Sequence, residues 1–170
     1  FTAVGVDLIR DESGCSKTTL YTYFKNKQQL VNAVLNTRDA RFRSALTEYI
    51  AEAQGFAALE KIYHWHMQWF QTDTFKGCLF VRAVGESAQS DQQLIEISRH
   101  HKQWIKQLIA SHCTCLTNSH QVAELFYTLL EGLISRFMVD GYDQQLAEQH
   151  WQMILQWTGA QHNSTTVSSC

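Results

Sequence analysis

The residues best suited to chemistry lie at positions 15–27, in the segment CSKTTLYTYFKNK. Leu20 and Phe24 are four residues apart and would share one face of a short helix. The opposite face would carry amine, hydroxyl and aromatic groups from Lys17, Thr18, Thr19, Tyr21 and Tyr23. Amines and hydroxyls can hydrogen-bond to phosphates and base edges, so this face suits a helix that lies in the major groove of DNA.

Cap and turn residues on both sides of this segment indicate a two-helix pattern. Ser16 is a natural N-cap, because its hydroxyl can accept a hydrogen bond from an N–H of the first turn. Before it, residues 13–15 break a preceding helical stretch, and Gly14 can adopt the left-handed backbone of a tight turn. After it, Asn26 can cap the next helix, with Lys27 within reach of a phosphate. The residues therefore predict a helix-turn-helix.

Residues 3–35 resemble the DNA-binding signature of TetR-family transcriptional repressors, through the run GVDLIRDESGCSKTTLYTYFKNKQQLVNAVL. The resemblance implies an all-α fold, with an N-terminal DNA-binding head and a C-terminal helical body for ligand binding and dimerisation. It implies that the family's contacts with double-stranded operator DNA fall on Lys17, Thr18, Thr19, Tyr21, Tyr23 and Lys27. TetR-like heads have one more helix before this point, so we expect the sequence to be truncated there. Val4 and Gly5 stand where many relatives have a threonine that touches a phosphate.

The charge of the chain is unevenly distributed. Residues 1–43 contain seven basic and four acidic residues, a net charge of +3, whereas the rest contains seven and twelve, a net of −5. A basic head on an acidic body suits a regulator that binds DNA with one end. No apolar run approaches the roughly 18 residues of a membrane span, so we expect no membrane partner. Five cysteines in a chain of this size indicate reduced thiols and a cytoplasmic location.

Helical periodicity continues through the rest of the chain. It predicts helices over residues 26–53, 57–72, 77–86, 92–113, 121–139 and 143–158. We expect a DNA-binding region over 1–43, which includes the start of a linker helix, and a ligand-binding and dimerisation domain over 44–159. Residues 160–170 are polar and rich in Ser and Thr, which predicts a disordered tail.

Aromatic and sulfur-bearing residues of the middle helices are expected to line an apolar pocket for a small-molecule effector. The segment 77–86 (GCLFVRAVGE) resembles one that lies under the ligand pocket in TetR-like domains. The expected lining residues are Tyr63, His66, Met67, Trp69, Phe70, Phe80, Trp104 and Phe126. A plain core role is the alternative for each of them. The leading hypothesis is a repressor that a small, largely apolar ligand releases from its operator.

The last two predicted helices carry more apolar and small residues than one subunit needs to cover. Such a surface normally marks a partner, and two helix pairs related by a two-fold axis would form a four-helix bundle. We therefore expect a homodimer. The expected interface residues are Tyr127, Gly132, Ser135, Trp151 and Trp157.

Thiol chemistry provides the alternative function, a redox- or electrophile-sensing repressor that uses Cys78 or Cys113 and Cys115. A nearby cation or a helix N-terminus lowers the pKa of a thiol, and Cys78 lies at the N-terminal end of the predicted helix 77–86, one turn before Arg82. Cys15 is instead expected to fill the core of the helix-turn-helix.

Metal binding and catalysis are the remaining alternatives. Soft and imidazole ligands cluster around one loop, but the Cys-x-Cys spacing is tighter than that of usual zinc sites, so no metal is expected. These residues are His112, Cys113, Cys115 and His120. The sequence contains no phosphate-binding loop, no nucleophile elbow and no apolar pair of carboxylates. We therefore expect neither an enzyme nor a cofactor.

Overall fold

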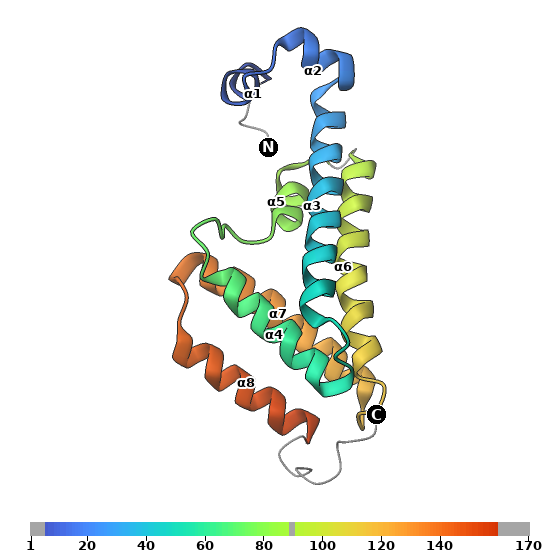
Figure 1. Ribbon diagram of the computed structural model, residues 1–170, viewed down its shortest axis with the longest axis vertical. Helices are drawn as coiled ribbons and strands as arrows, with labels where there is room; N and C mark the ends of the chain where they lie inside the picture. Colours follow the sequence, from blue (N-terminus) through green and yellow to red (C-terminus); the bar gives the residue numbers. More distant parts are fainter. Residues whose placement is uncertain (1–5, 89–90, 160–170) are drawn as a thin grey trace. The chain divides into compact units, whose positions relative to one another are not determined.

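The computed structural model describes residues 6–88 and 91–159, and these residues form helices and no strands (Figure 1). The helices are α1 (Val6–Ser13), α2 (Lys17–Tyr23), α3 (Lys27–Ile50), α4 (Gly55–Phe70), α5 (Leu79–Glu86), α6 (Gln92–His112), α7 (Ser119–Asp140) and α8 (Gln144–Thr158). The predicted all-α fold is confirmed, with a helix in each predicted segment. The predicted tail and the Val4–Gly5 pair lie outside the described residues.

Local capping explains the helix boundaries around α2. The hydroxyl of Ser16 accepts a hydrogen bond from the amide of Thr19 at 3.0 Å, as expected for an N-cap. At the start of α3, Asn26 Oδ1 accepts from the amide of Gln29 at 2.9 Å. The side chain of Gln29 in turn accepts from the amide of Lys25 at 2.9 Å. Between α1 and α2, Gly14 has a φ of +67°, which explains the glycine in this turn.

The chain divides into two compact units. Unit 1 comprises Phe1–Phe42 and Leu79–His101, and unit 2 comprises Arg43–Cys78 and Lys102–Cys170. The first boundary lies beside the expected division at residue 43. Residues 79–101, in contrast, belong to unit 1, although they lie within the expected ligand-binding and dimerisation domain of residues 44–159. The functional roles of the two divisions remain predictions.

His101 on α6 is a central packing residue of unit 1. Its side chain is only 3% exposed, and its Nδ1 atom lies 2.7 Å from Asp39 Oδ1 on α3. Its ring stacks on that of Phe80 on α5, with centroids 3.7 Å apart. The ring of Phe42 meets it edge-on at 5.0 Å. This cluster therefore joins three helices within unit 1.

Tyr63 on α4 has the corresponding position in unit 2. It is 1% exposed, and its hydroxyl donates a 2.6 Å hydrogen bond to the carbonyl of Ala147 on α8. Its ring also meets that of Phe126 on α7, with centroids 6.4 Å apart. Figure 1 shows α4, α7 and α8 running beside one another, and Tyr63 contacts both neighbours of its own helix.

Candidate DNA-binding site

The α2 helix leaves its polar and aromatic face open to solvent. Lys17, Thr18 and Thr19 are exposed, as are Tyr21 at 52% and Tyr23 at 76%. Lys27 begins α3 and is partly buried. The apolar rings of exposed tyrosines are unfavourably hydrated, and such rings are common where a protein binds a partner. The structure thus presents the predicted face, while the contacts of these residues with DNA remain predictions.

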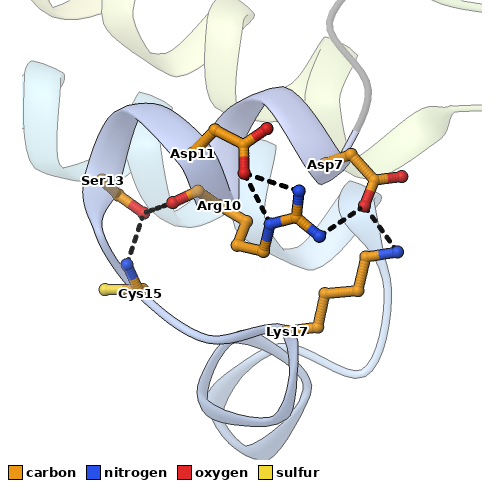
Figure 2. Close-up of polar contacts among 6 residues, drawn as sticks. All are labelled: Asp7, Arg10, Asp11, Ser13, Cys15 and Lys17. Carbon is orange, nitrogen blue, oxygen red and sulfur yellow. Dashed lines mark hydrogen bonds and ion pairs between the residues drawn. The ribbon is translucent and has the colours of Figure 1, made fainter.

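An ion-pair network occupies the amine of Lys17 (Figure 2). Lys17 Nζ lies 2.5 Å from Asp7 Oδ1, and Arg10 Nη1 lies 3.2 Å from the same oxygen. Arg10 also donates to Asp11 through Nε at 2.6 Å. The hydrogen bond from Lys17 holds the pKa of Asp7 below its ordinary value, and the charges of Lys17 and Arg10 act in the same direction. Asp7 therefore competes with a phosphate for the amine of Lys17.

The threonines of the face differ in their hydrogen bonds. The hydroxyl of Thr19 lies 2.8 Å from that of Ser16 and so belongs to the helix cap. Thr22 donates to the carbonyl of Thr18 at 2.8 Å within the helix. Thr18 is therefore better placed than Thr19 to offer its side chain to a base edge or phosphate.

Cys15 was expected in the core of the helix-turn-helix, and this prediction is wrong, because its side chain is exposed. The amide of Cys15 donates to Ser13 Oγ at 3.2 Å, which fixes the turn and leaves the thiol toward solvent (Figure 2). No side chain from residue 7 to residue 24 is buried, so this part of the structure has no interior for the thiol to fill.

The residues expected to form the ligand pocket are dispersed. Tyr63, His66, Met67, Phe70 and Phe126 are buried in unit 2. Trp69 is partly buried against Phe75, and Trp104 lies under the guanidinium of Arg43 at 5.1 Å. Phe80 belongs to unit 1, where it stacks on His101. The single pocket that contains all eight residues remains a prediction.

Two of these eight residues, Tyr63 and Met67, line a cavity of about 330 Å³ between α4 and α8. The rim of this cavity contains glutamine, tyrosine and glutamate side chains, among them Gln144 and Glu148. Sequence reasoning missed these rim residues, because polar side chains on a helix look like an ordinary solvated face. The polar spacing of residues 144, 148 and 152, four apart on α8, was the available signal.

The residues expected at the dimer interface do not share one surface. Gly132 and Trp157 line a groove of about 390 Å³ between α7 and α8, together with Leu125 and Leu129. Ser135 is exposed on α7. Tyr127 instead lies under the ammonium of Lys106 at 5.5 Å, and Trp151 lines the cavity between α4 and α8.

Across residues 6–88 and 91–159, no three His, Cys, Asp or Glu side chains are arranged to hold a metal ion. None of the helices in the same ranges is long and apolar enough to cross a membrane.

Known proteins resemble this chain in its N-terminal segment and in its fold. Residues 1–34 match the family model of bacterial regulatory proteins, tetR family. A putative TetR transcriptional regulator (sav143) from Streptomyces avermitilis has a TM-score of 0.78 at 15% identity, covering 92% of this chain and 88% of that chain. SCO4454, a TetR-family transcriptional regulator from Streptomyces coelicolor, has a TM-score of 0.73 at 18% identity, covering 94% of this chain and 85% of that chain. The reduced form of Escherichia coli NemR has a TM-score of 0.72 at 18% identity, covering 90% of this chain and 85% of that chain. No curated protein matches the chain significantly.

The match of residues 1–34 and the order of α1, a tight turn and α2 are those of a helix-turn-helix segment. More narrowly, the chain carries a tetR-family N-terminal segment on the fold of TetR-family transcriptional regulators.

Proposed function

We propose that the chain is a sequence-specific transcriptional repressor that a small, largely apolar ligand releases from its operator. The observation that supports this most is the open face of α2. Lys17, Thr18 and two tyrosines are exposed on it, and α2 contains no buried residue. Two exposed aromatic rings on one short helix are typical of a surface that a partner covers. Its place in a tetR-family segment indicates that this partner is double-stranded DNA.

Operator binding by this route requires two copies of α2. A two-fold dimer would present its recognition helices to half-sites about 34–36 Å apart, one turn of DNA. A ligand that favours another spacing would weaken the complex, and by linkage the operator must weaken ligand binding by the same factor.

The groove between α7 and α8 supports the proposed dimer. Leu125 and Trp157 line it and are exposed at 47% and 45%, although each has a large apolar side chain. Gly132 lies in the same groove without a side chain, so a helix of a second copy could approach closely. Burial of this face against its own copy would form a four-helix bundle.

Opposite changes to the ion pair of Lys17 should have opposite effects on DNA binding. Lys17→Ala should weaken binding to all DNA sequences. It should also reduce the slope of log affinity against log salt concentration by about one, the value for one lost phosphate contact. Asp7→Asn should strengthen binding by up to about fivefold, because it removes a carboxylate that competes with phosphates for the amine, and exposed pairs are worth at most about 1 kcal/mol. Fluorescence anisotropy of labelled DNA at several salt concentrations would measure both effects.

The matched control is Lys106→Ala, which removes an amine that pairs with Glu124 in unit 2. It should leave the affinity and the salt dependence unchanged. Equal losses of DNA affinity in Lys17→Ala and Lys106→Ala, or weaker DNA binding in Asp7→Asn, would contradict the proposed contact between Lys17 and DNA.

A thiol-sensing repressor is the second candidate function. The cysteines that it could use differ in their exposure to solvent. Cys115 is exposed and Cys78 partly exposed, whereas Cys113 is buried. Burial raises the pKa of the Cys113 thiol to about 11, so that it stays protonated near neutral pH. Because the thiolate is the reactive form, this second candidate depends on Cys78 or Cys115.

Cys113 should accordingly react much more slowly than Cys115, which lies only two residues away. At pH 7 a thiol with a pKa near 11 is ionised in about one molecule in ten thousand. Iodoacetamide labelling followed by peptide mass spectrometry would give both rates in one experiment. The rate at Cys113 should rise as the pH approaches 11. Similar rates at neutral pH would show that Cys113 is accessible and ionised.

A further inference from the structure

The cavity between α4 and α8 has an aromatic floor that is held in place. The rings of Tyr63 and Trp151 lie 5.1 Å apart at an angle of 31°, and Met67 lines the same cavity. The hydroxyl of Tyr63 is bonded to the carbonyl of Ala147 and its side chain is only 1% exposed, so Tyr63 holds Trp151 in place from the protein side. Trp151 is partly exposed and is the aromatic ring that a ligand can contact. The floor therefore needs little rearrangement to bind an apolar group.

The formal charge at the mouth of the cavity is negative. Among the residues that line it, Glu148 is the only Asp, Glu, Lys or Arg. Gln144 donates to the carboxylate of Glu148 at 2.8 Å, which orients the carboxylate and leaves its charge uncompensated. Burial raises the pKa of the Tyr142 hydroxyl, and the negative charges of Glu148 and Asp143 act in the same direction.

We propose that this cavity binds an organic cation with an apolar body, such as a quaternary ammonium or a charged aromatic compound. Aromatic faces attract cations through their quadrupole, and a nearby carboxylate adds direct attraction. The apolar body would lie against Trp151 and Met67, and the charge would lie toward Glu148 and Tyr142. An anion of the same size would be repelled by the carboxylate of Glu148. Among the lining residues the only other side chain that can carry a full charge near neutral pH is the imidazole of His64, whose ring lies 5.7 Å from that of Trp151.

The position of the cavity on α8 indicates how binding would reach the dimer. Glu148 in the cavity and Trp157 in the groove are nine residues apart, about two and a half turns, and so face opposite sides of α8. The ligand would therefore leave the dimer face open while it changes how α8 packs on α4. This regulatory role rests on the proposed function, whereas the binding itself does not.

The test uses phenyltrimethylammonium and its neutral isostere tert-butylbenzene, which differ by one charged atom. Each is titrated into the full chain without DNA, and the indole N–H signals of the five tryptophans are followed by NMR. Trp151→Phe identifies the signal of Trp151. The cation should cause a saturable shift centred on that signal, and the neutral isostere should bind several-fold more weakly. The absence of a saturable shift, or equal affinity for both compounds, would overturn the proposal.

A matched pair of variants tests the role of the carboxylate. Glu148→Gln should weaken binding of the cation by about threefold to tenfold and leave that of the isostere unchanged. Glu52→Gln removes an exposed carboxylate of unit 2 that does not line the cavity, and it should have no effect. Equal effects of the two variants would contradict a specific site. Because no DNA is present, failure here is distinct from failure to bind an operator.

Discussion

Replacing Gly132 by arginine should convert the proposed dimer into a folded monomer. A Cβ atom at Gly132 meets no other atom within 4 Å, so the larger side chain finds open space within its own subunit. In the seam between two subunits the same guanidinium would be buried without a partner, which costs several kcal/mol. Light scattering at micromolar concentration should give 19.6 kDa for the variant and twice that mass for the wild type.

Gly85→Arg provides the matched control. Gly85 is also an exposed helical glycine with no atom within 4 Å of an added Cβ, but it lies on α5 in unit 1. This variant should remain a dimer. Operator affinity should fall in Gly132→Arg alone, because a monomer binds one half-site at a time. A dimeric Gly132→Arg, or a monomeric wild type, would contradict both the interface and the two-half-site mechanism.

Replacing His101 by alanine should have the largest effect on stability, about 2–4 kcal/mol. The change removes the ring that stacks on Phe80 at 3.7 Å and leaves a cavity at a position that is only 3% exposed. It also removes the 2.7 Å hydrogen bond to the carboxylate of Asp39. Urea unfolding followed by circular dichroism would measure the change in the free energy of unfolding.

The neighbouring histidine serves as the control for this prediction. The side chain of His100 is 65% exposed and pairs with Glu96 at 3.0 Å on the helix surface. His100→Ala should change stability by no more than about 0.5 kcal/mol. If both variants lose the same free energy, the stacked cluster around His101 does not stabilise unit 1 as described.

Local signals predicted the helix boundaries well. Ser16 and Asn26 cap their helices as expected, because a cap depends on residues three positions apart. Gly141 likewise ends α7 with a φ of +83°. Periodicity located the helices for the same reason, since an apolar face repeats within its own helix.

Long-range arrangement was not predictable in this way. Lys17 pairs with Asp7 across a turn, so the pair depends on the path of the chain between two helices. Phe80 has the apolar character of a pocket residue, but its partner is His101, and no local pattern indicates which side chains an apolar residue will meet. The exposed Cys15 shows that a position typical of a core residue still needs neighbours to cover it.

Nuclease footprinting with the full-length protein, on DNA from its own gene and the neighbouring genes at low salt, tests the central claim most directly. We expect one protected palindromic site whose half-sites are about 10–10.5 base pairs apart, or a multiple of that spacing. Protection should weaken as salt rises and should be reduced in Lys17→Ala. If no site is protected on any of these fragments at low salt, the proposal that this chain is a DNA-binding repressor is contradicted.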